Sequence, residues 1–170
     1  ISENKRLKKV LEDISFSENT IIAKALIDKQ SPFLRSIIIN KGSKDNILKG
    51  MAVLYESYLI GKIIEVNYMT SRVLLISDLN SKIPVTIEPE GVQSILSGDG
   101  KTSGIIQYMK EKIEIHTNSV VYTSGTGDLL KAGIPIGKIK QNEKNYKVNF
   151  FVDFSQIRYV KVLSYNEEIN

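Results

Sequence analysis

The sequence contains no cysteine and a single histidine, His116. Without cysteine the chain can form no disulfide, no thiolate nucleophile and no thiolate metal site, and a single histidine excludes histidine pairs. No apolar run approaches the roughly 18 to 20 residues that cross a bilayer, and no segment has the pattern of a signal peptide. We therefore predict no metal site and no cofactor.

The charge balance gives little information about a partner. The 170 residues are 42% hydrophobic and 25% charged, which is enough apolar material for the core of one domain or of two small ones. The 23 basic and 19 acidic residues give a net charge of +4 and a pI of about 9.1. Because both signs are mixed along the chain, this surplus is typical of a solvated surface rather than of a nucleic-acid-binding face.

The most informative segment is 120–140, which has β-branched ends around four of the eleven glycines. This pattern predicts a strand, a wide glycine turn and a second strand. The second strand contains Ile136-Gly137-Lys138-Ile139, and the same four letters occur 76 residues earlier at Ile60-Gly61-Lys62-Ile63. That spacing exceeds the roughly 20 to 50 residues of a solenoid repeat and suits a duplicated small domain. We predict two related β-domains with Gly61 and Gly137 on equivalent strands, and with Gly125 and Gly133 as further structural glycines of the second hairpin.

Helical periodicity is confined to the first 14 residues. There Leu7, Val10, Leu11 and Ile14 recur at i, i+3, i+4 and i+7, with charged residues on the other face. This stripe either packs on the domain behind it or forms the last two turns of a coiled coil through which chains self-associate, and two heptads do not decide between these. Because the chain opens inside a helical pattern, we expect it to be part of a longer protein.

From Thr20 onward, short strands alternate with turn signals, which predicts an all-β sandwich or barrel. The strand predicted at 58–67 has apolar residues on both faces, so we expect it to be buried on both sides. Turn signals at 88–91 and 97–101 bracket the predicted domain boundary. The predicted division is 1–14 for the end of the helix, 15–95 for the first β-domain, 96–165 for the second and 166–170 for a tail.

Two other classes of function were weighed against these patterns. Paired small barrels are also the architecture of chymotrypsin-like hydrolases, and the chain offers His116, Ser124 and Asp128. All three lie on about one hairpin, whereas that architecture draws its triad from both barrels, so we predict no catalytic residue.

The second alternative is a small barrel that binds single-stranded nucleic acid through aromatic platforms in a basic groove. The chain has eight tyrosines, but aromatic and basic residues interleave only at Tyr146-Lys147 and at 158–161. A steep loss of oligonucleotide affinity with added salt would favour this alternative.

Five motifs in order make the chain similar to a known family. They are S-I-I-I-N-K-G-S-K-D at 36–45 with G-M-A-V at 50–53, L-I-G-K-I at 59–63, R-V-L-L-I-S-D at 72–78, V-Y-T-S-G at 121–125 and G-I-P-I-G at 133–137. This set resembles the bacterial rod shape-determining MreC family over nearly the whole chain. The chain departs from the family at Asn118-Ser119, where a Gly-Asp pair is usual, and at Leu130-Lys131, where a Phe-Pro pair is usual.

The resemblance implies a transmembrane helix upstream of this chain, then a coiled coil, then a periplasmic region of two small six-stranded antiparallel β-barrels. It also implies a non-enzymatic scaffold of the peptidoglycan elongation machinery, which maintains rod shape at the periplasmic face of the inner membrane. The implied partners are a penicillin-binding transpeptidase, MreD and other MreC copies, associated as a dimer or filament.

Overall fold

The computed structural model describes residues 19–26, 35–107, 109, 113–125, 130–141 and 146–164. The predicted helix at 1–14, with Leu7, Val10, Leu11 and Ile14, and the predicted tail at 166–170 lie outside the described residues. In the described ranges the strands are β1 (Asn19–Leu26), β2 (Ser36–Ile39), β3 (Ala52–Tyr55), β4 (Tyr58–Val66), β5 (Ser71–Leu75), β6 (Lys82–Glu88), β7 (Val92–Gly98), β8 (Ser103–Gln107), β9 (Val120–Thr123), β10 (Pro135–Gln141), β11 (Tyr146–Phe150) and β12 (Tyr159–Ser164), and the 3-10 turns are η1 (Ser43–Asp45) and η2 (Phe154–Gln156).

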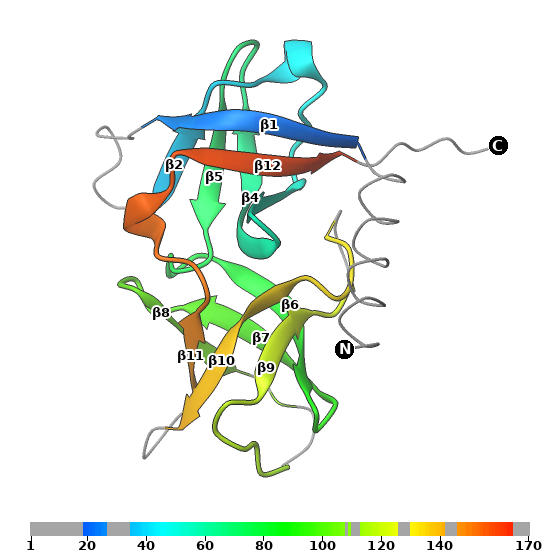
Figure 1. Ribbon diagram of the computed structural model, residues 1–170, viewed down its shortest axis with the longest axis vertical. Helices are drawn as coiled ribbons and strands as arrows, with labels where there is room; N and C mark the ends of the chain where they lie inside the picture. Colours follow the sequence, from blue (N-terminus) through cyan, green and yellow to red (C-terminus); the bar gives the residue numbers. More distant parts are fainter. Residues whose placement is uncertain are drawn as a thin grey trace, which may run out of the picture.

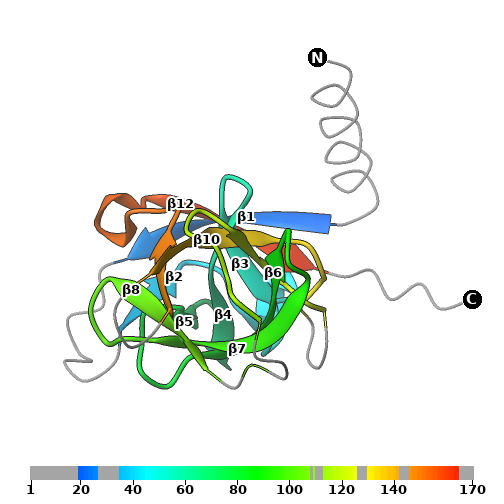
Figure 2. The same cartoon turned by 90° about the horizontal axis from the view of Figure 1, so that it is seen from below.

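These strands close into two six-stranded antiparallel barrels. The order is β1-β12-β3-β4-β5-β2 in the first barrel and β10-β11-β8-β7-β6-β9 in the second. Figure 1 shows the barrels one above the other along the long axis of the molecule, and Figure 2 views them from below. The prediction of an all-β chain with two small barrels of about six strands each is therefore confirmed.

The predicted boundary between residues 95 and 96 is wrong, because it cuts through β7. Strands β6 to β11 form the second barrel, which is continuous in sequence from Lys82 to Phe150. β12 then returns to the first barrel and lies between β1 and β3. The first barrel is therefore built from both ends of the described chain, and the second barrel is inserted between them.

Buried serines make β7 hard to recognise as a strand from the sequence. Ser94 lies on the inward side of β7 with Val92 and Leu96, and Ser97 lies on the outer side, and both are buried. The Ser94 hydroxyl donates to the carbonyl of Gln107 at 2.6 Å, and the Ser97 hydroxyl accepts from Lys82 Nζ at 3.0 Å. Buried polar groups are tolerated when they are hydrogen-bonded, so the apolar alternation that marks a strand is interrupted here.

The two repeated hairpins occupy equivalent places in the barrels. In the first barrel Gly61 of β4 lies opposite Val53 of β3, and in the second Gly137 of β10 lies opposite Val121 of β9. Each hairpin is followed by a strand that pairs with its second member, β5 in the first barrel and β11 in the second. Continuing round the barrels, β2, β1 and β12 correspond to β8, β7 and β6. The barrels thus share one topology, with β12 in the place of β6.

Close backbone approach explains why glycine stands at both equivalent positions. A Cβ on Gly61 would clash with the backbone oxygen of Leu74 on β5. A Cβ on Gly137 would clash with the backbone oxygen of Asn149 on β11. Glycine in a strand often marks such an approach, because it has no side chain to accommodate.

Asn118, one of the departures from the family pattern, has a left-handed backbone with φ of +75°. Gly50 holds the matching place before β3, with φ of +96°. The backbone N–H of Asn118 donates to the carbonyl of Ile139 at 2.9 Å, and that of Gly50 donates to the carbonyl of Ile63 at 2.8 Å. Asparagine tolerates the left-handed region better than most residues, so the turn is the same in both barrels despite the substitution.

Each barrel has an apolar core, and strands β3 and β4 contribute to both cores. Val53 and Ile60 lie in the core of the first barrel, whereas Leu54 and Leu59 belong to the cluster that fills the second. The outer side of this hairpin therefore packs against the second barrel. The prediction that the strand at 58–67 is buried on both sides is confirmed for this part of β4.

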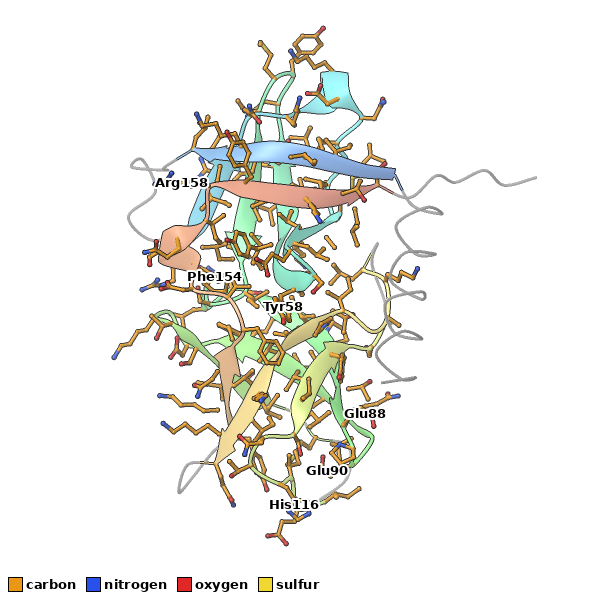
Figure 3. The ribbon with its side chains drawn as sticks, viewed as in Figure 1. Tyr58, Glu88, Glu90, His116, Phe154 and Arg158 are labelled. Atoms are coloured by element: carbon orange, nitrogen blue, oxygen red, sulfur yellow. The ribbon has the colours of Figure 1, made fainter. Side chains whose placement is uncertain are left out.

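Aromatic rings fill the junction between the barrels. Tyr58 packs on Phe151 with ring centres 4.9 Å apart, and Phe150 packs on Phe154 at 5.4 Å. Phe154 lies in η2, which leads from the second barrel back to β12, and it contacts both cores. Figure 3 shows Tyr58 and Phe154 between the barrels. The junction is thus apolar and closely packed.

A buried carboxylate holds the linker between β5 and β6. Asp78 accepts hydrogen bonds from the backbone N–H of Arg35 at 2.6 Å and of Asn80 at 2.7 Å. Arg35 Nε donates in turn to the carbonyl of Gly100, in the turn between β7 and β8, at 2.8 Å. Segments of both barrels are therefore tied to one point, which opposes rotation of one barrel against the other.

Candidate functional site

The exterior of the first barrel carries an apolar surface on β1 and its neighbours. Ile22 on β1 has 62% of its surface exposed, and Tyr159 on β12 has 60%. Figure 1 shows these two strands side by side across the front of the barrel. We call this surface the β1 face and define it by six outward side chains, which are Ile22, Lys24, Leu26, Ile38, Tyr159 and Lys161.

Strand geometry and pairing bring these side chains together. Successive residues of a strand point to opposite faces, so Ala23 is buried in the barrel while Ile22 and Lys24 are exposed. In the register Ile22 lies opposite Lys161, and Lys24 lies opposite Tyr159. Apolar and cationic side chains therefore alternate across both strands. An exposed apolar patch with charged residues around it is typical of a protein interaction surface.

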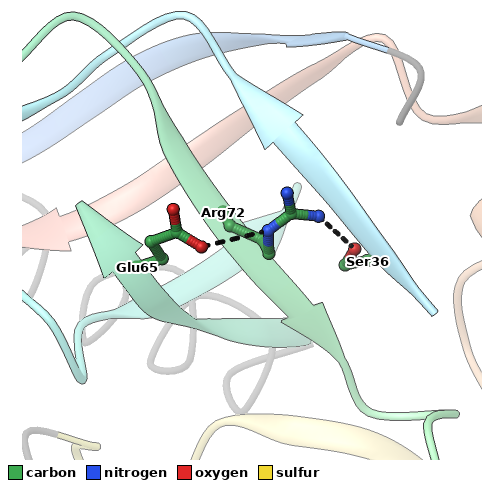
Figure 4. A network of polar contacts seen from close by, with 3 residues as sticks. All are labelled: Ser36, Glu65 and Arg72. Atoms are coloured by element: carbon green, nitrogen blue, oxygen red, sulfur yellow. Dashed lines mark hydrogen bonds and ion pairs between the residues drawn. The ribbon is translucent and has the colours of Figure 1, made fainter. Parts of the chain in front are cut away.

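A polar network borders the β1 face on the side of β5. Arg72 Nη1 donates to the hydroxyl of Ser36 at 3.1 Å, and Arg72 Nε lies 3.4 Å from Glu65 Oε2 (Figure 4). Arg72 also stands opposite Ile38 in the pairing of β2 with β5. Because more than half of the Glu65 side chain is exposed, this ion pair contributes at most about 1 kcal/mol. The network therefore marks the edge of the β1 face and adds little to the stability of the barrel.

The second barrel has two shallow depressions along β10 and β11, of about 430 and 370 Å³. Lys140 and Asn149 line both, Lys138 lines the larger and Lys147 the smaller. Lys140 and Lys147 lie directly opposite each other in the register, which is unfavourable for like charges. The described residues that line the depressions include no acidic side chain, so this surface attracts anions weakly.

Glu90 joins two turns at the lower end of the second barrel, where Figure 3 shows it beside His116. Its Oε1 accepts from the Ser119 hydroxyl at 2.7 Å and from the backbone N–H of His116 at 3.1 Å. Burial raises the pKa of Glu90, but the hydrogen bonds from Ser119 and His116 favour the ionised form and leave the pKa below its ordinary value. Glu90 therefore acts as an ionised clamp between the turns.

Two of the residues considered for a hydrolase triad, His116 and Ser124, are not brought together. β9 separates His116 from Ser124, and its four residues span about 13 Å at about 3.3 Å per residue. A general base must lie within about 3 Å of the hydroxyl that it activates, so these two residues form no catalytic pair. Asp128 lies outside the described residues. In the described ranges no group of three or more metal-binding side chains converges, and no helix has the length and apolar character needed to cross a membrane.

The tyrosines do not form an aromatic platform on the described surface. Of those that the structure describes, only Tyr68 and Tyr159 are exposed, one in the turn after β4 and the other on β12. Tyr146, which the sequence places beside Lys147, packs against the core of the second barrel, and its hydroxyl accepts from the backbone N–H of Ile115 at 3.3 Å. Tyr146 is thus a packing residue of the second barrel and not part of an exposed aromatic platform.

The other two structural glycines lie between β9 and β10. Gly125 and Gly133 have φ of +78° and +86°, a region that favours glycine. The Gly133 backbone N–H donates to the carbonyl of Thr123 at 2.9 Å, and the Thr123 hydroxyl donates to the carbonyl of Lys131 at 2.6 Å. Both glycines thus serve the shape of this connection.

Sequence reasoning did not single out Ile22 or Leu26, and it noted Tyr159 only within the segment 158–161, where aromatic and basic residues interleave. In the segment T-I-I-A-K-A-L at 20–26, apolar residues occur at both odd and even positions, which point to opposite faces of a strand. From the sequence alone, both faces therefore look buried. The sequence does contain one indication. Lys24 lies on the same face of the strand as Ile22 and Leu26, and a lysine there indicates that this face is exposed.

Two closed barrels joined by an apolar junction, with an exposed apolar face on one of them, define this chain as a tandem-barrel protein. The model of the family "Rod shape-determining protein MreC, barrel core" matches residues 26–164. The chain belongs to the MreC family.

Similarity to individual proteins agrees with this assignment. The cell shape-determining protein MreC of Cereibacter sphaeroides is 32% identical over 143 residues, which cover 84% of this chain and 48% of that protein. The crystal structure of MreC from Pseudomonas aeruginosa has a TM-score of 0.77 at 26% identity and covers 85% of this chain and 98% of that one. MreC in a complex with penicillin-binding protein PBP2 from Helicobacter pylori shares the fold, with a TM-score of 0.64 at 16% identity over 87% of this chain and 99% of that one. The chain spans about half the length of the curated relatives that it matches.

Proposed function

We propose that this chain is the barrel region of a non-enzymatic scaffold that maintains rod shape by binding proteins of peptidoglycan synthesis. The observation that carries the proposal is the β1 face, an apolar surface on a rigid barrel wall. Ile22 and Tyr159 are held by the paired strands β1 and β12, so they reach a partner without the entropic cost of ordering a loop.

The chemistry of the β1 face suits a protein partner. Binding energy in such interfaces is concentrated in a few large side chains, with aromatic residues enriched, and charged residues form the rim. Here Tyr159 and Ile22 are the central candidates, and Lys24 and Lys161 supply the rim. The lysines favour a partner with acidic residues around an apolar centre.

A penicillin-binding transpeptidase is the first partner that we propose, because an MreC of the same fold forms a complex with one. MreD and further copies of the chain complete the proposed set. Another solved relative is the major periplasmic domain of a cell shape-determining filament, which supports a periplasmic location. We propose in addition that the full-length protein has a single-pass anchor in the inner membrane.

The proposal is tested by titrating this chain with the periplasmic part of the transpeptidase from the same organism in a calorimeter. Ile22→Asp or Tyr159→Ala removes a central contact and is expected to weaken binding by about 30-fold or more. Leu79→Asp is the matched control, because Leu79 is 64% exposed but lies in the linker between β5 and β6. If the control weakens binding as much as the β1-face variants do, or if none of them changes it, the β1 face is not the docking surface.

A further inference from the structure

Three large exposed apolar side chains gather at the end of the first barrel that points away from the second. Tyr68 and Met69 lie in the turn between β4 and β5 with 69% and 57% exposure, and Leu48 lies between β2 and β3 with 58%. Figure 1 shows the β4–β5 turn and η1 together at the top of the molecule, and Figure 3 shows side chains projecting there. We call this surface the tip and define it as Lys41, Lys44, Leu48, Lys49, Tyr68 and Met69.

Backbone hydrogen bonds join the two segments of the tip into one unit. The N–H groups of Ser43 and Lys44 donate to the carbonyls of Asn67 and Tyr68 at 2.9 and 3.1 Å. A Cβ on Gly42 would clash with the carbonyl of Asn67, so the two segments touch along their backbones. The exposed side chains therefore stand on a fixed support and not on a loose loop.

The exposure of Leu48 is imposed by its neighbours. Ile47 and Met51 are buried in the core of the first barrel, with only 1% and 2% of their surface accessible. The backbone N–H of Leu48 lies 3.3 Å from Met51 Sδ. With both neighbouring apolar residues anchored inside, the Leu48 side chain is directed to solvent.

The tip is positively charged. Lys44 and Lys49 are exposed and Lys41 is half-exposed. Asp45 is the one acidic residue of the described segment 41–50, and its Oδ2 accepts from the backbone N–H of Gly42 at 3.1 Å. The nearby Glu65 on β4 is paired with Arg72. The segments that form the tip thus carry three lysines and one carboxylate beside the three exposed apolar side chains.

We propose that the tip docks on an anionic lipid surface. Tyr68, Met69 and Leu48 would enter the headgroup region, and the three lysines would contact lipid phosphates. Aromatic and aliphatic side chains ringed by lysine are the composition that binds bilayer interfaces and anionic headgroups.

The shape of the tip favours lipid over a protein partner. Two narrow turns present few side chains, whereas a stable protein interface buries about 800 Å² on each partner. The tip lies at the opposite end of the first barrel from the second barrel, and β1 and β12 run across its side (Figure 1). A lipid surface at the tip therefore leaves the second barrel and the β1 face accessible.

The contribution of the lysines is tested by sedimenting this chain with mixed vesicles of phosphatidylglycerol and phosphatidylcholine. Vesicles of phosphatidylcholine alone serve as the uncharged comparison. Binding is expected to the anionic vesicles, and it should fall as salt is added. Each lysine near such a surface contributes a factor of about five, so Lys44→Gln with Lys49→Gln should weaken binding by roughly 25-fold. Lys138→Gln with Lys140→Gln is the matched control for charge, placed on the second barrel.

Insertion is tested separately, because the chain has no tryptophan. Tyr68→Trp introduces a single fluorophore at the tip, and Leu79→Trp introduces one at an exposed position elsewhere. Anionic vesicles are expected to shift the emission of Tyr68→Trp to the blue and to leave that of Leu79→Trp unchanged.

Several results would overturn the proposal. The first is that the chain does not bind anionic vesicles at low salt. The second is that Lys138→Gln with Lys140→Gln weakens binding as much as Lys44→Gln with Lys49→Gln does. The third is that the emission of Tyr68→Trp does not shift. A further one is a tip variant that binds vesicles normally but loses the transpeptidase or self-association, which would make the tip a protein site.

Discussion

At the scale of single residues, Gly61 and Gly137 show how a repeated tetrapeptide reflects a backbone requirement. Each lies on the second strand of an equivalent hairpin, against a carbonyl of the following strand. The sequence made the equivalence visible because both copies keep the letters I-G-K-I. It could not show the clash, since the contact depends on how closely the next strand approaches.

Alanine at either position is expected to destabilise its barrel. Gly61→Ala or Gly137→Ala should lower the free energy of unfolding by about 3 kcal/mol, because the backbone must move to admit a methyl group. Gly91→Ala is the control, since its φ is +71° but nothing lies within 4 Å of an added Cβ, so a loss of only about 1 kcal/mol is expected. Urea unfolding measures all three, and equal losses would contradict the close-approach account.

Glu90 makes stability depend on pH in a defined direction. Its pKa in the folded chain lies below the ordinary value of 4.5, so ionised Glu90 stabilises the fold above that value. The contribution should disappear as the pH falls through the lowered folded-state pKa. Melting temperatures of the native chain and of Glu90→Gln, measured from pH 7 to pH 3, should differ at neutral pH and converge in acid. A difference that grows toward low pH would mean that Glu90 is not the clamp described here.

At the scale of elements, β12 is the strand on which closure of the first barrel depends. It pairs with β1 and β3 and supplies Val160 and Val162 to the core. Removing residues 159–170 leaves β1 and β3 with unpaired edges, whereas the second barrel keeps all six of its strands.

Hydrogen exchange should resolve the effect of this truncation barrel by barrel. We expect amides of β1 to β5 to lose protection and those of β6 to β11 to keep it. The double variant Val160→Asp and Val162→Asp should give the same pattern in a chain of full length. Retained protection in β1 to β5 would show that the first barrel closes without β12.

The positions of most strands could be predicted from turn signals and from the alternation of apolar and polar residues. Which strands pair with one another could not. β12 falls within the run of short strands predicted from Thr20 onward, yet its return to the first barrel depends on pairing with β1, more than 130 residues earlier. The same limit explains the wrong boundary inside β7. Only the order of strands in space assigns β6 and β7 to the second barrel.

At the scale of the whole molecule, the two barrels are packed against each other. The junction is filled by aromatic rings, and Asp78 ties the linker to both barrels through Arg35. Because both barrels are closed, the described strands offer no unpaired edge for strand addition between molecules. Any self-association would then use side-chain surfaces or the predicted helix at 1–14.

Sedimentation of the chain should show weak, concentration-dependent self-association, because two helical heptads bury few side chains. Leu7→Asp with Leu11→Asp should weaken it further, and the upstream heptads of the full-length protein should strengthen it. A tight dimer that survives these substitutions would place the contact on the barrels, and Ile22→Asp would then test the β1 face.

Complementation of a strain that lacks the chromosomal gene tests the central claim most directly, since it asks whether an exterior face carries function. In the full-length protein, Ile22→Asp with Tyr159→Ala is expected to give a folded protein at normal abundance that fails to restore rod shape. His116→Ala and Ser124→Ala are expected to restore it fully. Rod-shaped cells with the β1-face variant, or round cells with a folded His116→Ala or Ser124→Ala protein, would contradict the account.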